Sequence, residues 1–184
     1  MNIYVVLLRG INVNGKNILK MSELTERLIE AGFREVKTYI QSGNIVFVHE
    51  SNSDIELEKK LKALILENFG LDIPVVVLSP EEIRKAIESN PFMKEKDIDI
   101  RHLHITFLGG LPQEDKIIAL QNGNYGSDQF FHSEKKIYLH CPNGYGKTKL
   151  TNTMLESKLK VNATTRNWKT INELLKIAEN LKKT

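Results

Sequence analysis

The sequence predicts an α+β fold built from two ferredoxin-like (split βαβ) subdomains in tandem. The 184 residues are 41% hydrophobic and 27% charged, a composition typical of a globular protein with room for two small cores. Short β-rich apolar runs alternate with longer segments whose apolar residues recur every three or four positions. The resulting order is strand, helix, strand, strand, helix, strand, and it occurs twice. That is the element order of the ferredoxin-like fold.

The N-terminal subdomain is predicted to span residues 1–78. Ser22 is expected to cap its first helix and Ser53 or Asp54 its second, because short polar side chains accept hydrogen bonds from the free amides of a first turn. Gly32 and Gly70 mark the two helix ends. The predicted boundaries in this half are strands at 1–8, 33–39, 44–48 and 73–78, and helices at 23–32 and 54–68.

Residues 79–101 are predicted to connect the two halves through a short helix, which Pro80 begins and Asn90-Pro91 ends. The C-terminal α+β subdomain, 102–184, then repeats the order of the first half. Its predicted boundaries are strands at 103–108, 125–131, 136–141 and 161–167, and helices at 112–120, 148–159 and 170–181. No residue-level repeat accompanies this order, so the prediction of two subdomains rests on the elements alone.

Composition excludes several classes of protein. No apolar run approaches the roughly 18 residues that cross a bilayer, and the chain start lacks a signal-peptide pattern. We therefore expect a cytoplasmic protein with no membrane partner. Cys141 is the only cysteine, which rules out an internal disulfide and four-cysteine zinc sites. No HExxH spacing occurs either. A His-plus-carboxylate site stays open as an alternative, but no metal and no cofactor is expected.

Histidine offers two further candidates. His102 and His104 share one face of a predicted strand, and an ordinary partly exposed pair is favoured over a metal or catalytic pair. His140 stands beside Cys141, but adjacent strand residues point to opposite faces. Activation of the thiol by that imidazole is therefore not expected.

Positive charge is concentrated at the C-terminal end. Residues 135–184 hold 11 Lys and Arg against 3 Asp and Glu, whereas the whole chain has a formal net charge of +3. The preceding residues are therefore net acidic. This asymmetry predicts that the C-terminal half faces an anionic ligand such as nucleic acid or a nucleotide.

The segment HCPNGYGKT, residues 140–148, is similar to the end of the phosphate-binding motif GxxxxGK(S/T). The match fails because the first glycine of that motif would fall at Cys141. Pro142 also removes a backbone N–H that a phosphate cradle would use. Nucleotide hydrolysis by this loop is therefore not expected.

A weaker prediction survives for the same loop. Gly144 and Gly146 allow backbone amides to converge, and the loop leads into a predicted helix whose N-terminus favours anions. Anion binding is therefore predicted for this loop, with positive charge from Lys147 and Lys149. The alternative is a strand-to-helix turn with solvated lysines.

The segment ATTRNW, residues 163–168, is the second polar cluster. Arg166 has the fork geometry that binds phosphate or carboxylate, and Trp168 has a ring that stacks on bases. Asn167 completes this candidate group. The alternative is that Thr165 or Asn167 caps the last helix and Trp168 fills the core.

Two segments of the N-terminal half place polar groups at strand ends. Residues 9–16 follow the first strand, and 39–44 join the second to the third. Both are predicted to line one rim, with ligand contacts from Arg9, Asn12, Gln41, Ser42 and Asn44. The alternative is that the asparagines and glycines serve only to form turns.

Taken together, these motifs resemble a bacterial family known as domain of unknown function 1697. The resemblance covers nearly the whole chain and is carried by LLRGINVNGKN, YIQSGNIVF, NPF, HLHITFL, LHCPNGYGKTKLTN and ATTRNWKT. The chain departs from the family pattern at Asn14, where glycine is usual, and at Lys169, where asparagine is common. The resemblance implies two α+β halves related to the ferredoxin-like fold. It also implies polar signatures that include the candidates above, together with Tyr145 and Thr148, as ligand-binding residues. It implies no particular activity.

The leading functional hypothesis is a protein that binds a phosphate-bearing ligand, nucleic acid or nucleotide, through its basic C-terminal half. One alternative is an enzyme acting on a phosphorylated or carboxylated metabolite, with Lys147 and Arg166 as electrophilic clamps. Another is a protein-interaction module that uses exposed sheet edges. The sequence further predicts that the two C-terminal loops meet the 9–17 loop at a shared anion site, and it leaves the oligomeric state open.

Overall fold

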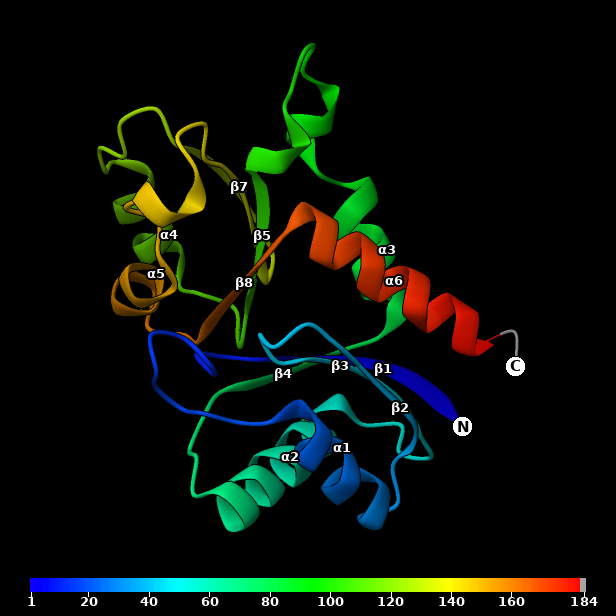
Figure 1. The fold of residues 1–184 in the computed structure, drawn as a ribbon. Helices are drawn as coiled ribbons and strands as arrows, with labels where there is room; N and C mark the ends of the chain where they lie inside the picture. Colours follow the sequence, from blue (N-terminus) through cyan, green and yellow to red (C-terminus); the bar gives the residue numbers. More distant parts are fainter. Residues whose placement is uncertain (183–184) are drawn as a thin grey trace. The chain divides into compact units, whose positions relative to one another are not determined.

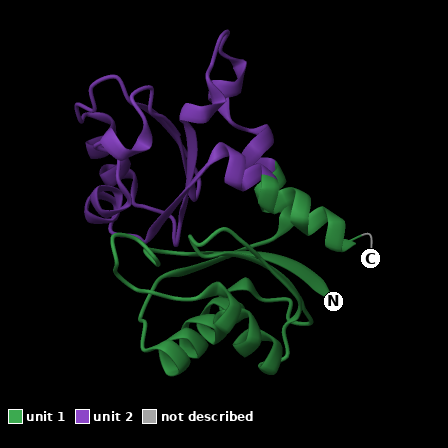
Figure 2. Ribbon diagram, viewed as in Figure 1, with its two compact units in different colours: residues 1–84, 173–184 green, residues 85–172 purple. Residues whose placement is uncertain are grey.

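The computed structural model describes residues 1–182, which form an α+β fold with two four-stranded antiparallel sheets and flanking helices (Figure 1). The chain forms two compact units. Unit 1 consists of residues 1–84 and the segment from Glu173 onward, and unit 2 consists of residues 85–172 (Figure 2). The division falls within helix α3 (Pro80–Glu88) and within helix α6 (Trp168–Lys182).

This division differs from the predicted boundaries at residues 78 and 102. The prediction placed the whole C-terminal helix in the second subdomain, whereas the structure assigns the part from Glu173 onward to unit 1. The second part of α6 lies with unit 1, where Glu179 Oε1 is 2.7 Å from Arg84 Nη2 of α3. The chain therefore returns to its first unit after completing the second. Sequence order alone does not reveal such a return.

Unit 1 has the strand order β2-β3-β1-β4, which is the ferredoxin-like order. Helices α1 and α2 lie on one face of this sheet (Figure 1), where Val6, Leu8 and Phe47 meet Leu24 and Leu61 in a common core. The elements of this unit are β1 (Asn2–Leu8), α1 (Met21–Glu30), β2 (Arg34–Tyr39), β3 (Asn44–His49), α2 (Asp54–Phe69) and β4 (Val75–Leu78).

Unit 2 has the order β6-β7-β5-β8, the same order advanced by four strands. Helices α4 and α5 cover one face of this sheet, and Leu108, Leu139 and Ala163 pack there against Leu120 and Leu155. Its elements are the 3-10 helices η1 (Pro91–Lys94), η2 (Ile100–His102) and η3 (Tyr145–Lys147), with β5 (Leu103–Leu108), α4 (Glu114–Gln121), β6 (Gln129–Ser133), β7 (Lys136–His140), α5 (Asn152–Leu159) and β8 (Ala163–Asn167). The predicted tandem fold is confirmed.

The capping predictions were right for α2, whereas in α1 the stop at Gly32, which has a φ of 90°, was right and the Ser22 N-cap was wrong. Ser53 Oγ accepts a hydrogen bond from Glu56 N at 3.2 Å, and Gly70 adopts a left-handed φ of 67° after the last turn. In α1 the N-cap is Lys20, which makes no side-chain cap hydrogen bond, and Ser22 already lies within the first turn. The helix starts two residues earlier than predicted, at Met21, whose side chain is buried in the core.

The two largest boundary differences from prediction in unit 2 are at the starts of β6 and α5. Strand β6 begins at Gln129 rather than 125, because residues 125–128 form a turn in which Asp128 N donates to Tyr125 O at 3.3 Å. Helix α5 begins at Asn152 rather than 148, with Thr151 as its N-cap. Within residues 1–182, no helix combines the length and apolar character that a membrane span requires.

Candidate functional site

The glycine-lysine loop of unit 2 is closed by its own hydrogen bonds. After β7 the chain turns at Gly144, which has a φ of 89° and whose N–H donates to Cys141 O at 2.9 Å. Lys147 N donates to Gly144 O at 3.1 Å, and Thr148 N donates to Tyr145 O at 3.2 Å. These three amides therefore do not form the converging cradle that the sequence suggested. Because α5 starts four residues later than expected, the loop does not lead directly into its N-terminus either.

Thr148 is a structural residue of this loop. Its side chain is buried, its Oγ1 donates to Asp128 Oδ2 at 2.6 Å, and the same oxygen accepts from Leu150 N at 3.0 Å. Asn143 Nδ2 makes a parallel contact with Ser127 Oγ at 2.8 Å. The loop is therefore tied to the turn at 125–128, while Lys147 and Lys149 remain exposed.

Tyr145 of the same loop stacks on a buried histidine. The rings of Tyr145 and His104 have centroids 4.7 Å apart and planes inclined by 24°. His104 is 8% exposed, and burial lowers the pKa of its imidazole below the ordinary value. Its Nδ1 lies 3.3 Å from His102 O, and because a carbonyl only accepts, that contact requires the proton on Nδ1. Tyr145 is partly exposed and is thus supported from behind by a neutral ring.

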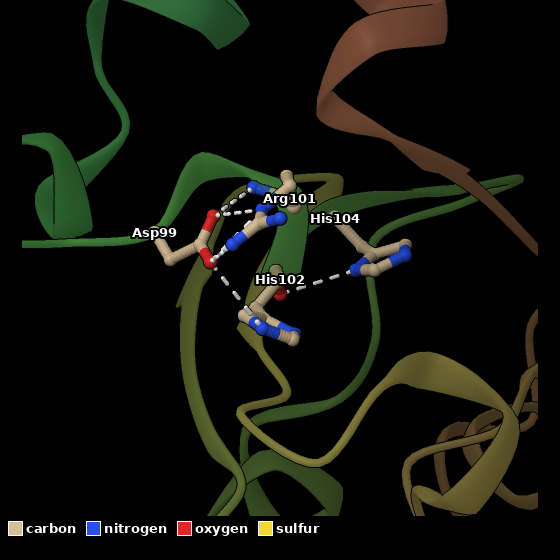
Figure 3. A network of polar contacts seen from close by, with 4 residues as sticks. All are labelled: Asp99, Arg101, His102 and His104. Atoms are coloured by element: carbon tan, nitrogen blue, oxygen red, sulfur yellow. Dashed lines mark hydrogen bonds and ion pairs between the residues drawn. The ribbon is translucent and has the colours of Figure 1, made fainter.

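His102, whose backbone O is in contact with His104 Nδ1, also forms polar contacts with Asp99 (Figure 3). Asp99 accepts hydrogen bonds from the Arg101 guanidinium at 2.7–3.0 Å, which with the Arg101 backbone N–H lowers the pKa of that carboxyl to about 2. His102 Nε2 lies 3.6 Å from Asp99 Oδ2, whereas the His104 ring stacks on Tyr145. The imidazole ring of His102 therefore lies beside Asp99, and that of His104 lies on Tyr145. Among residues 1–182, no group of three or more His, Cys, Asp or Glu side chains could hold a metal ion.

The Arg-Asn-Trp candidates are divided by the sheet. In the β5–β8 register, Asn167 pairs with His104 and Arg166 pairs with Ile105. Neighbouring strand residues point to opposite faces, so Arg166 projects from the face opposite His104 and its Tyr145 partner. Arg166 Nη1 also donates to Thr165 O of its own strand at 2.9 Å. The sequence grouped Arg166 with Lys147 by charge, but the strand alternation separates Arg166 from the Tyr145 face.

The remaining members of this cluster have structural roles. Asn167 Oδ1 accepts from Thr170 N at 2.8 Å and caps α6, as the alternative interpretation expected. Trp168 is 8% exposed and therefore lies in the interior. Thr165 Oγ1 donates to Asn152 Oδ1 at 2.6 Å. These contacts account for most of the polarity of ATTRNW without a ligand.

In unit 1 the two predicted segments lie side by side. Asn12 Nδ2 donates to Gln41 O and to Leu19 O, each at 2.8 Å, and Asn12 Oδ1 accepts from Leu19 N at 2.9 Å. Asn44 is fully buried and donates to Tyr39 O at 3.0 Å and to Ser42 Oγ at 2.9 Å. The two asparagines thus form turns, whereas Gln41 is exposed and Arg9 and Ser42 are partly exposed.

A cleft of about 550 Å³ in unit 1 contains none of the predicted site residues. Its walls include Ile3 of β1, Pro80 of α3 and Ala178 of α6. Arg84 and Glu179, which form an ion pair, also line it. Sequence reasoning missed this cleft because its walls come from segments at both ends of the chain. No local motif marks such a combination.

Comparison with known proteins agrees with this architecture. The structure resembles that of the conserved bacterial protein SP0830 from Streptococcus pneumoniae with a TM-score of 0.77 and 26% sequence identity. The match covers 96% of this chain and 98% of the other. No curated protein matches the chain. The family described as "Protein of unknown function (DUF1697)" matches residues 1–138, and the chain belongs to this family.

Proposed function

We propose that the protein binds a phosphate-bearing ligand, single-stranded nucleic acid or a nucleotide, at the unit 2 surface formed by Tyr145, Lys147 and Lys149. The observation that carries this proposal is the stack of Tyr145 on His104. Tyr145 is partly exposed, and His104 holds its ring in one orientation. The side chain therefore loses little conformational freedom when a base packs on it.

The neighbouring lysines supply the second half of the recognition. Lys147 and Lys149 are exposed and flank the loop's buried anchor, Thr148. A stacking ring beside ammonium groups matches a nucleotide, which presents a flat base beside a phosphate. The positive charge of residues 135–184 adds a favourable long-range field for such a ligand.

The experiment is a titration of a fluorescently labelled single-stranded oligonucleotide, followed by anisotropy at several salt concentrations. Tyr145→Ala should weaken binding at least about fivefold, because stacking contributes about 1–3 kcal/mol per base. Tyr145→Phe should bind like the wild type. Lys147→Ala should weaken binding to all sequences alike and reduce the slope of log K against log salt by about 0.7.

Lys59→Ala serves as the matched control, since Lys59 is an exposed lysine on α2 of unit 1. It should leave affinity and salt slope unchanged. Thermal unfolding of each variant separates lost binding from lost folding. Competition by a mononucleotide distinguishes the two proposed ligands. A nucleotide site should release the oligonucleotide when the mononucleotide is added, whereas a nucleic-acid site should retain it. Equal loss in Lys59→Ala and Lys147→Ala, or no binding to oligonucleotide or mononucleotide, would overturn the proposal.

A further inference from the structure

The two sheets have four edge strands, and two of these are covered by side chains. At β4, Glu58 Oε1 of α2 accepts a hydrogen bond from Val77 N at 3.1 Å. At β8, Glu156 Oε1 of α5 accepts from Ala163 N at 3.1 Å. One outward amide of each strand is therefore already engaged by a carboxylate from the preceding helix. Such protection opposes pairing with another chain.

The edge at β2 is interrupted in another way. Its register with β3 shifts between Arg34 and Lys37, and Glu35 within this bulge has a φ of 51°. Most of its side chains are exposed, and several are charged. Bulges and charges on an edge strand both disfavour further pairing.

Strand β6 has neither form of protection. Its five residues pair with β7 without a register shift, and no strand among residues 1–182 lies on its other side. Cys141 N donates to His102 O, so the backbone N–H and C=O of Cys141 face β5. Because these groups alternate in direction along a strand, those of residues 137 and 139 of β7 also face β5, and those of 136, 138 and 140 face β6. The pairing with β7 then leaves the N–H and C=O groups of Phe130 and His132 pointing outward.

The side chains of this edge are apolar at its centre. Phe130 packs against the unit 2 core, whereas Phe131, on the opposite face, is 51% exposed. The strand Gln129–Ser133 contains no Asp, Glu, Lys or Arg. An exposed aromatic residue in an uncharged, regular edge strand is an unusual surface for a monomer.

We propose that β6 pairs antiparallel with β6 of a second copy of this chain, across a two-fold axis that passes beside Phe131. In this register Phe130 pairs with His132 of the partner subunit, so the outward groups of each strand meet those of the other. Phe131 faces Phe131 of the partner subunit in a non-hydrogen-bonded pair, where side chains approach most closely. Two four-stranded sheets become one eight-stranded sheet.

A second copy fits this edge because the strand is complementary to itself. Both outward residues find hydrogen-bonding partners, both exposed phenylalanines become buried, and no charged side chain of Gln129–Ser133 opposes another. An unrelated acidic or basic peptide would gain no ion pair here. The interface uses unit 2 alone and shares no residue with the proposed ligand surface.

The first test is the molar mass in solution, measured by sedimentation equilibrium on the full chain. The wild type should show twice the monomer mass of 21.1 kDa. Phe131→Lys should raise the dimer dissociation constant at least about tenfold, because it places two ammonium groups opposite each other. Leu111→Lys is the matched control, since Leu111 is 68% exposed in a loop of the same unit, and it should remain dimeric.

Cysteine cross-linking tests the register. Opposed residues of a non-hydrogen-bonded pair have Cα atoms about 4.5 Å apart, which a disulfide can span, so Phe131→Cys should cross-link under a mild oxidant. Ser133→Cys should not cross-link, because the two introduced cysteines would be four residues out of register. At about 3.4 Å per residue they would lie roughly 14 Å apart. Cys141 is buried and does not compete. A monomeric wild type, an unchanged dimer in Phe131→Lys, or equal cross-linking of both cysteine variants would overturn the proposal.

Discussion

The ring of Tyr145 lies on the imidazole of His104, with centroids 4.7 Å apart, although 41 positions separate the two residues in the chain. This contact joins the glycine-lysine loop to the central strand β5. It makes the orientation of an aromatic surface residue depend on a buried histidine. The proposed ligand surface and the protonation of that histidine are therefore linked.

Acid should destabilise the protein partly through His104. Burial lowers the pKa of this side chain in the folded state below its ordinary value of 6.5, so the unfolded chain binds a proton at higher pH than the folded one. Stability from this group is full above pH 6.5 and falls below it, by at most about 1.4 kcal/mol per pH unit. Urea unfolding of wild type and His104→Phe at pH 7 and at pH 5 measures the effect.

The His104→Phe variant retains a ring beneath Tyr145 but has no imidazole to protonate. Its unfolding free energy should therefore fall less than that of the wild type between pH 7 and pH 5. Burial and Lys60 also lower the pKa of His49, which is present in both proteins and cancels in the comparison. An equal fall in both proteins would contradict the assignment.

Gly43→Ala should destabilise the protein more than Gly10→Ala. Both glycines have a positive φ, 76° and 70°, which costs an alanine about 1–2 kcal/mol. At Gly43 an added Cβ would also lie 2.7 Å from Leu8 Cβ and 2.8 Å from Ile11 Cδ1, whereas at Gly10 nothing lies within 4 Å. Overpacking should add about 1–3 kcal/mol at Gly43 alone. Chemical denaturation of the two variants gives the difference, and equal losses would refute the steric argument.

Cys141 should be unreactive in the native protein. Its side chain is fully buried, and burial raises the pKa of the thiol to about 11. Since the thiolate is the reactive form, a disulfide reagent should label the native protein very slowly near pH 8. Complete labelling of one thiol is expected in denaturant. Fast labelling of the native protein would show that the thiol is accessible, and would revive a nucleophilic role for it.

Removal of the β4 edge cover should weaken the first sheet. Glu58→Ala deletes the acceptor of the Val77 N–H and should cost about 1 kcal/mol of unfolding free energy. Glu67→Ala on the same helix is the control, because Glu67 is exposed and at the far end of α2. Denaturant titration measures both. A loss in the control as large as in Glu58→Ala would mean that the hydrogen bond contributes nothing of its own.

Much of the fold could be predicted from local patterns. Ser53 and Gly70 delimit α2 through hydrogen bonds and dihedral angles that involve only a few neighbouring residues, and these predictions were right. The predicted start of α5 was wrong because Thr148, a plausible helix residue in isolation, donates a hydrogen bond to Asp128, twenty positions earlier. The boundary depends on a contact that periodicity does not encode.

The same distinction between local patterns and long-range contacts applies to the candidate site. The sequence by itself determined the order of strands and helices and the concentration of charge, because hydrophobic periodicity and composition are properties of the chain alone. Only the tertiary structure decided the roles of the polar residues. Strand register placed Arg166 opposite the Tyr145 face, and packing buried Asn44, Thr148 and Trp168. Side-chain direction and burial depend on neighbours far apart in sequence, which no local pattern specifies.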